Sequence, residues 1–110
     1  MAEALKVLGQ AALAATTPTD VYTVPSGKSS VISTVFLCNR SAGAVAVRLS
    51  VAVAGAGADN KQYVYYDVSV PANDTLALTA GITLAATDVL RAYAASADIS
   101  VNVFGSEITP

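Results

Sequence analysis

Apolar residues alternate strictly with small or polar ones between Ala44 and Val53, and this pattern limits the folds open to the chain. The apolar set is Val45, Val47, Leu49, Val51 and Val53, and the set between them is Ala46, Arg48, Ser50 and Ala52. A period of two places the two sets on opposite faces of a β-strand. We therefore predict a strand here that packs one face on a core and turns the other toward solvent.

Turn-forming residues divide the rest of the chain into short segments of the same kind. Gly, Pro, Asn and Asp gather at intervals of roughly 8–12 residues, which is typical of all-β sandwiches and barrels. The predicted strands are Asp20–Val24, Ser30–Cys38, Ala44–Val53, Gln62–Val70, Thr75–Thr79, Thr87–Ala94 and Ile99–Phe104. We predict an all-β fold, an antiparallel two-sheet β-sandwich that is jelly-roll-like and has an N-terminal arm, with residues 18–110 as its single domain.

The segment Ser30–Cys38 differs from the others because both of its faces are apolar. One face holds Val31, Val35 and Leu37, and the other holds Ile32, Phe36 and Cys38. Strands that are buried on both faces have this near-continuous apolar character. We predict a central strand covered on both sides, with the Cys38 thiol buried as a small apolar group.

Residues 1–17 are rich in Ala and Leu but lack the sustained alternation of the later segments. They are expected to form an N-terminal arm that reaches a neighbouring subunit, or else the first strand of the sandwich. Pro18 marks the boundary, because the residue before a proline is biased away from the helical region. No run approaches the 18 or more apolar residues that a transmembrane helix needs, so no membrane partner is expected.

The side chains that carry most enzyme and metal chemistry are missing. The chain has no His, no Trp and a single Cys, which excludes His-dependent nucleophilic catalysis and zinc sites built from His or several Cys. The residues Asp59, Asp67, Asp74 and Asp88 lack the spacing of a calcium loop. The net charge is −2 and the six basic residues are scattered, which disfavours nucleic acid as a partner. We expect no enzymatic activity, no cofactor and no metal.

The composition predicts contact with other protein chains. Only 13% of the residues are charged, whereas soluble domains carry roughly 25%. A lone copy of so small a chain has too few charges to cover its surface, and we therefore expect a homo-oligomer. The candidate interface residues are Leu5, Val7, Leu8, Leu13, Tyr63 and Tyr65.

The tyrosines between positions 63 and 66 have three possible roles. Tyr63 and Tyr65 point to one face of a predicted strand, and Tyr66 points to the other. Aromatic clusters on strands pack across neighbouring strands, anchor protein interfaces or provide a platform on which sugar rings stack. All three roles remain open at this point.

Seven short stretches stand in a characteristic order along the chain. They are Leu8–Gln10, Thr19–Lys28, Cys38–Ser41, Asn60–Asp67, Pro71–Thr75, Leu84–Asp88 and Val103–Glu107. Together they resemble the small structural proteins encoded by tailed bacteriophages, and the resemblance extends from Leu8 to Glu107.

The resemblance implies a non-enzymatic virion protein of the capsid decoration or cement type. Such a protein binds the major capsid protein on the outer surface of the assembled head, commonly as a trimer, and stabilises the shell. The alternative is a ligand- or receptor-binding β-sandwich module of a phage tail or fibre. The features that favour this alternative are the tyrosines Tyr63, Tyr65 and Tyr66 and the loop Gly55–Asn60.

Overall fold

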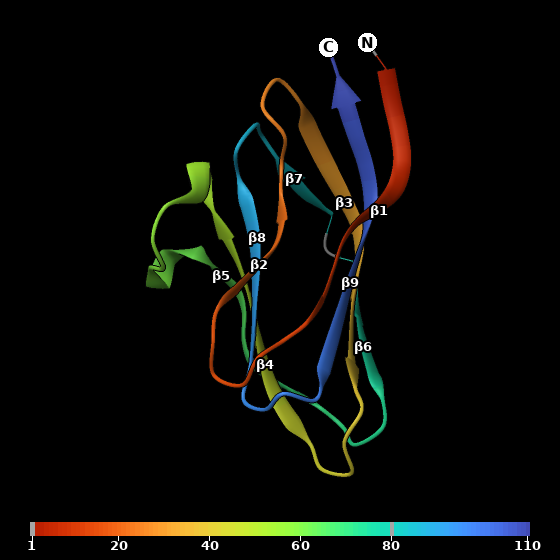
Figure 1. Cartoon of the computed structure of the whole chain (residues 1–110), viewed down its shortest axis with the longest axis vertical. Helices are drawn as coiled ribbons and strands as arrows, with labels where there is room; N and C mark the ends of the chain where they lie inside the picture. Colours follow the sequence, from red (N-terminus) through yellow and green to blue (C-terminus); the bar gives the residue numbers. More distant parts are fainter. Residues whose placement is uncertain (1, 80) are drawn as a thin grey trace.

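Two antiparallel β-sheets packed face to face make up the computed structural model, which describes residues 2–79 and 81–110 (Figure 1). The first sheet has the strand order β1 (Ala2–Ala12), β9 (Ile99–Thr109), β3 (Ser29–Asn39) and β6 (Thr75–Leu78), with β7 (Ile82–Leu84) also paired to β3. The second sheet has the order β2 (Thr19–Thr23), β8 (Val89–Ala94), β4 (Val45–Ala52) and β5 (Tyr63–Val70). Two short 3-10 turns, η1 (Val53–Gly55) and η2 (Asn60–Gln62), join β4 to β5. The prediction of an all-β, two-sheet antiparallel sandwich is confirmed.

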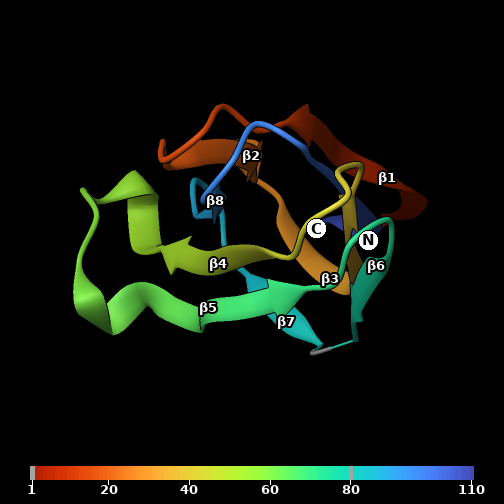
Figure 2. The same ribbon diagram turned by 90° about the horizontal axis from the view of Figure 1, so that it is seen from below.

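The hydrophobic core lies between the two sheets and takes side chains from both. Figure 2 shows the layers from below, with β3 and β6 in one layer and β4 and β5 in the other. The first sheet contributes Ile32, Val35, Leu37, Ile99, Val101 and Val103, and the second contributes Val47, Leu49, Val70, Leu90 and Ala92. From Ile99 to Val103 in β9 the buried residues stand at every second position, as the alternation of that segment predicts.

A β-bulge changes the faces predicted for β3. The register between β3 and β9 shifts between Ile32 and Thr34, so the side that faces the core changes within the strand. The buried residues are Ile32, Val35 and Leu37, and the outward residues are Val31 and Phe36. The prediction that both faces are covered is wrong, because β3 is central within its sheet but only its inner face meets the other layer.

A similar change of phase occurs in β4. Its register with β5 shifts on both sides of Leu49, and the adjacent residues Leu49 and Ser50 are both buried. Beyond this point Val51 is half-buried and Val53 is exposed. The predicted alternation therefore holds from Val45 to Leu49 and is wrong for the last two valines.

Residues 2–12 form the strand β1, which corrects the expectation of an unpaired N-terminal arm. β1 pairs antiparallel with β9 along its length, with one bulge between Val7 and Gly9. The next residue, Leu13, is 2% exposed and donates its backbone N–H to the carbonyl oxygen of Ile99 at 3.0 Å. Because these residues complete the sheet and the core, the structure contains the alternative first strand of the sandwich.

Two glycines allow close backbone contacts that a side chain would prevent. A Cβ atom on Gly9 would overlap the carbonyl oxygen of Val21, at the place where β1 meets β2 of the other sheet. A Cβ atom on Gly105 would overlap the carbonyl oxygen of Val31, next to the bulge in β3. Gly9 therefore allows β1 to approach β2 of the other sheet, and Gly105 allows β9 to approach β3 next to its bulge.

The described ends of the chain lie side by side at one end of the sandwich, where β1 and β9 pair (Figure 1). In residues 2–79 and 81–110 there is no helix long and apolar enough to cross a membrane.

Candidate functional site

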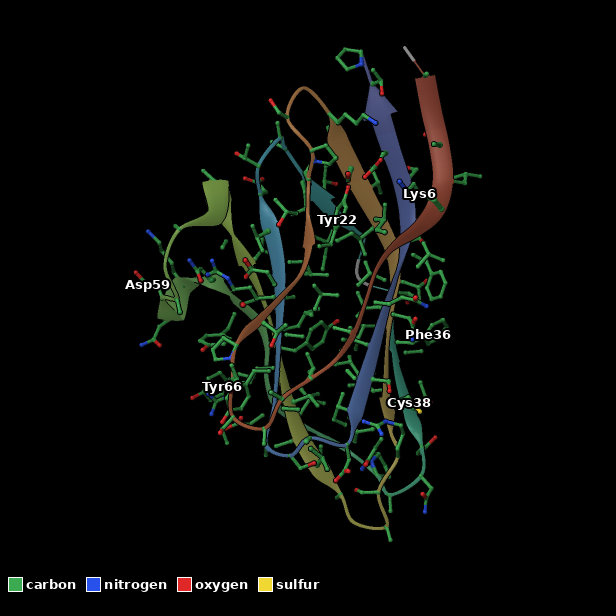
Figure 3. The ribbon with its side chains drawn as sticks, in the orientation of Figure 1. Lys6, Tyr22, Phe36, Cys38, Asp59 and Tyr66 are labelled. Atoms are coloured by element: carbon green, nitrogen blue, oxygen red, sulfur yellow. The ribbon has the colours of Figure 1, made fainter. Side chains whose placement is uncertain are left out.

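The outer surface of the first sheet carries a group of exposed or half-buried apolar side chains, here called the apolar face. It consists of Leu5 and Val7 on β1, Val31 and Phe36 on β3, and Phe104 on β9. Leu5 is 82% exposed, Val7 46%, and Val31 and Phe36 37% each. Figure 3 shows Phe36 pointing away from the sandwich on this side.

Strand pairing explains why these side chains gather. Val7 lies opposite Phe104 in the pairing of β1 with β9. The ring of Phe104 meets that of Phe36 edge to face, with 5.6 Å between the ring centroids. Aromatic pairs prefer this geometry. The exposed apolar groups therefore form one connected surface across three strands.

Charge is sparse in the described strands of the first sheet. The charged residues in the described strands of the first sheet are Glu3, Lys6 and Glu107. Nζ of Lys6 lies 3.2 Å from Oε1 of Glu107, whose side chain is buried. Glu3 stands two residues before Leu5 on the same face of β1, where it is exposed and forms no ion pair with the described residues. Exposed apolar patches of this kind mark sites of contact with other molecules.

A shallow groove of about 430 Å³ runs across the apolar face. Its lining comes from Leu5, Lys6 and Val7 on β1, Val31 and Ser33 on β3, and Phe104, Gly105 and Ser106 on β9. The middle strand has small residues at Gly105 and Ser106, whereas Leu5 and Val31 rise on either side of them. The groove therefore offers space for apolar side chains of another protein.

The outer surface of the second sheet is of a different kind, because it combines charge with aromatic rings. The guanidinium of Arg48 lies 4.2 Å from the ring centroid of Tyr66 and 4.3 Å from that of Tyr93. Its Nε donates to Oδ1 of Asp67 at 2.7 Å. The carboxylate of Asp67 raises the pKa of Arg48 above its ordinary value. The guanidinium of Arg48 is thus held in place by the two tyrosine rings and by the carboxylate of Asp67.

Arg91 makes a second ion pair on the same surface. Its Nε donates to Oδ1 of Asp20 at 2.7 Å, and its Nη1 donates to the carbonyl oxygen of Ala56 at 2.7 Å. The second contact fixes the connection between β4 and β5. Each charged side chain in the described strands of the second sheet therefore has a partner.

The tyrosines of β5 pack against other side chains. Tyr65 is half-buried against the core. Tyr63 is half-buried and meets the ring of Tyr66 edge-on, with 4.9 Å between the centroids. Tyr66 is 55% exposed and lies on the opposite side of the molecule from Phe36 (Figure 3). The interface and sugar-stacking roles of these residues stay predictions.

A buried polar cluster joins the two sheets. The hydroxyl of Tyr22 on β2 donates to Oε2 of Glu107 on β9 at 2.8 Å. Because the phenol has one proton, the hydroxyl of Ser30 on β3 must donate to Tyr22. The ammonium groups of Lys6 and Lys28 lie 3.2 and 3.8 Å from Oε1 of Glu107. The cluster ties β2 to the first sheet from inside the sandwich.

The cluster changes the acidity of its two central groups. Burial raises the pKa of Tyr22 to about 12, and the carboxylate of Glu107 adds to this effect. The hydrogen bond from Tyr22, together with Lys6 and Lys28, lowers the pKa of Glu107. No buried side-chain nitrogen or oxygen lacks a hydrogen-bond partner within the described residues. We therefore assign the cluster to stability, and sequence patterns gave no signal for it because its members lie in four separate segments.

Within the part of the chain that the structure describes, no three His, Cys, Asp or Glu side chains are grouped so that they could hold a metal ion.

The structure separates the predicted interface residues. Leu5 and Val7 lie exposed on the apolar face, Leu8 is half-buried, and Tyr63 and Tyr65 lie on the other sheet. The prediction that Leu13 is an interface residue is wrong, because its side chain is buried in the core, where a partner cannot reach it.

Sequence reasoning missed three members of the apolar face. The apolar pattern of Ser30–Cys38 predicts a strand covered on both sides and so does not indicate that Val31 and Phe36 are exposed. Phe104 ends the outward series of β9, after Ser100 and Asn102, and this alternation was the available signal. Cys38, predicted to be buried, is half-buried on the same strand as Phe36 (Figure 3).

Comparison with known proteins finds a loose similarity in structure. No family model matches the sequence, and no curated protein matches it. Two crystal structures of a pentameric capsid protein isolated from metagenomic phage sequences match with 18% sequence identity and a TM-score of 0.32. The match covers 96% of this chain and 64% or 65% of those chains, so the chain spans less than two thirds of their length. A similarity at this level carries no argument about function.

Proposed function

We propose that this protein is a non-enzymatic structural subunit that covers and joins other protein surfaces. The apolar face supports this proposal, because it presents connected apolar side chains beside an ion pair that is already satisfied. Burial of apolar surface stabilises an assembly by about 25 cal/mol per Å². A subunit of this kind needs contact area rather than reactive groups.

The finer proposal is a capsid decoration or cement protein of a tailed bacteriophage. Its support is the resemblance between the ordered stretches from Leu8 to Glu107 and small phage structural proteins. The partner is then the major capsid protein, the location is the outer surface of the head, and the bound form is a trimer. Repetition of an apolar contact over a symmetric shell raises the overall affinity through avidity.

The decisive experiment is to purify the particles that contain this chain and to determine its copy number and position. Quantitative mass spectrometry gives the ratio of this chain to the major capsid protein, and electron cryo-microscopy gives its position. We expect many copies on the outer surface, grouped at local symmetry axes. A few copies at a tail or fibre, with none on the head, would contradict the proposal.

Surface variants test whether the apolar face makes the contact. Phe36→Ser and Val31→Ser each remove a partly exposed apolar side chain from that face. Both are expected to lower the occupancy of the chain on particles. Val64→Ser is the matched control, because Val64 is 45% exposed but lies on β5 of the second sheet. Equal occupancy for all three variants would contradict a role of the apolar face.

The second candidate function is a ligand-binding module of a phage tail or fibre. The exposed ring of Tyr66 beside the guanidinium of Arg48 favours it, since sugars stack on aromatic rings and bind charged groups. The test is titration of the chain with neutral and acidic oligosaccharides, followed by nuclear magnetic resonance. Saturable shifts at Tyr66 that Tyr66→Ala abolishes would support this function over the first.

A further inference from the structure

We propose that the pocket between the end of β4 and the connection from β4 to β5 binds a small apolar carboxylate, such as a medium-chain fatty acid. The residues that line this pocket are Val51, Val53, Ala56, Lys61 and Gln62. The connection projects from the second sheet, and its residue Asp59 lies far from Phe36 of the apolar face (Figure 3). The pocket is therefore separate from the apolar face, and it can bind a ligand whether or not the chain belongs to a virion.

The pocket has the size of a ligand site and walls that are mainly apolar. Its volume is about 550 Å³, and ligand pockets in proteins span roughly 300–1,000 Å³. Val51 is half-buried and packs against the core, so it forms the side of the pocket nearest the core. Val53 is 69% exposed. A hydrocarbon chain that covers these two valines removes apolar surface from water, which favours binding.

Hydrogen bonds from β8 and the residue before it hold the first half of the connection. The backbone N–H of Ala54 donates to Oδ1 of Asp88 at 2.9 Å, and Nη1 of Arg91 donates to the carbonyl oxygen of Ala56 at 2.7 Å. Ala54 has a left-handed backbone with a φ of 54°, which is uncommon for a residue with a side chain. The backbone that carries Val53 and Ala56 is therefore fixed by contacts outside the connection.

Gln62 holds the second half of the connection. Its Nε2 donates to the carbonyl oxygen of Gly57 at 2.9 Å, and its Oε1 accepts the backbone N–H of Asp59 at 3.2 Å. The amide of Gln62 is thus already engaged by the protein. Because both halves of the connection are held, the pocket is formed before a ligand arrives, and binding does not have to order a loop.

Lys61 favours a ligand that carries one acidic group. It is the only charged residue among the described residues that line the pocket. Its ammonium group forms no ion pair with any described residue, whereas four of the other five cations of the chain each pair with a carboxylate. A sugar would find few hydrogen-bond partners in such a pocket. An apolar carboxylate needs only an apolar wall and one cation, and the pocket offers both.

Three carboxylates lie near the connection, and each already has a partner in the protein. Asp59 accepts the backbone N–H of Lys61, Asp88 accepts backbone N–H groups on two segments, and Asp20 pairs with Arg91. None of the three lines the pocket. Their negative charges weaken the attraction of an anion to Lys61, so most of the affinity must come from the hydrocarbon part of the ligand.

Titration of the whole chain with octanoate, followed by nuclear magnetic resonance, tests the proposal. We expect saturable shifts at Val51, Val53 and Lys61. Each methylene removed from the acid should weaken binding about fourfold, the factor for one buried methylene. Octanoate should bind more tightly than octanol, because Lys61 is exposed and can pair with a carboxylate that keeps most of its water.

Three results would overturn the proposal. The first is the absence of saturable shifts, and the second is shifts confined to the apolar face. The third is octanol binding as tightly as octanoate or more tightly, because a general apolar surface prefers the uncharged molecule.

Two variants assign the binding to the pocket. Lys61→Gln should weaken octanoate binding about two- to fivefold, the range for one exposed ion pair, and should leave octanol binding unchanged. Ala56→Trp adds bulk to the wall from an exposed position and should weaken the binding of both molecules at least tenfold. Arg40→Gln is the matched control, because Arg40 is an exposed cation outside the pocket whose Nη2 donates to the carbonyl oxygen of Ala97.

The control variant should bind octanoate like the unaltered chain. Lys61→Gln decides the outcome even if Ala56→Trp fails to fold, since it replaces one exposed side chain by another of similar length. Octanoate binding that is unchanged in Lys61→Gln, or reduced equally in Arg40→Gln, would overturn the proposed pairing of the ligand with Lys61.

Discussion

Gly105 lies where the backbones of β9 and β3 approach too closely for a side chain. An added Cβ would overlap the carbonyl oxygen of Val31 and lie 3.0 Å from Cα of Ile32, and neither backbone atom can turn aside. Gly105→Ala is therefore expected to lower the free energy of unfolding by about 2 kcal/mol or more. Denaturant unfolding measures this loss. Gly43→Ala is the control, because nothing lies near its Cβ position, and it should change stability by less than about 0.5 kcal/mol.

The cluster around Tyr22 and Glu107 predicts loss of stability at both ends of the pH range. The pKa of Glu107 is lowered in the folded chain, so its contribution is present above the ordinary carboxyl pKa and is lost as the pH falls below it. The pKa of Tyr22 is raised to about 12, so its contribution is present below pH 10 and is lost between about pH 10 and 12. Thermal unfolding across this range should show a plateau with a decline on each side.

Two variants assign these declines to their groups. Glu107→Gln should reduce the acid decline, and Tyr22→Phe should reduce the alkaline one, because each removes the proton that titrates. Both variants should be less stable than the unaltered chain at neutral pH. Tyr22→Phe takes the donor away from Oε2 of Glu107, and Glu107→Gln removes the carboxylate that pairs with Lys6 and Lys28. An alkaline decline that is unchanged in Tyr22→Phe would show that other tyrosines cause it.

At the scale of elements, two of the three leucines in β1 and the residue after it have opposite environments. Leu13 is 2% exposed in the core, and Leu5 is 82% exposed on the apolar face. Leu13→Ala should lower the free energy of unfolding by about 2 to 5 kcal/mol, because it leaves a cavity. Leu5→Ala should change it by less than about 0.5 kcal/mol when measured at concentrations where the chain is monomeric. Equal losses for both would contradict the pairing of β1 with β9.

Strand positions follow from the sequence, whereas the faces of two strands do not. Alternation and turn residues locate β2, β3, β4, β5, β6, β8 and most of β9. The sequence does not predict the short strand β7, because three residues are too few to show an alternating pattern. Bulges near Thr34 and Leu49 reverse the inward face, and a bulge depends on how two strands fit rather than on the residues of one. Residues 2–12 form a strand by pairing with β9, and local sequence patterns do not predict this pairing because β9 lies far away in the sequence.

Of the residues in the apolar face, the sequence predicts only the two on β1, Leu5 and Val7. Leu5 and Val7 follow from their apolar character in a segment without a partner in the sequence. Phe36 required knowledge of the bulge in β3, and Phe104 required knowledge of which side of β9 faces outward. The groove itself depends on three strands lying side by side, and no local pattern contains that information.

At the scale of the whole molecule, the two outer surfaces should respond to salt in different ways. The outer side of the second sheet has the ion pairs of Arg48 and Arg91, whereas the apolar face has connected apolar side chains. If the apolar face joins the copies, sodium chloride should change self-association little, and ammonium sulfate should strengthen it. Sedimentation velocity in the two salts measures this. Dissociation in sodium chloride would point instead to the charged surface of the second sheet.

The pairing of β1 with β9 joins the first strand of the chain to the last. β1 ends at Ala12 and β9 begins at Ile99, so about 90 residues must be synthesised before β1 has a partner. At roughly 5–20 residues per second, this takes on the order of 5 to 20 s on the ribosome. Throughout that time the apolar residues of β1 have no neighbouring strand and can meet other nascent chains. Synthesis of β9, rather than formation of any local turn, is therefore the event that gives β1 its neighbouring strand.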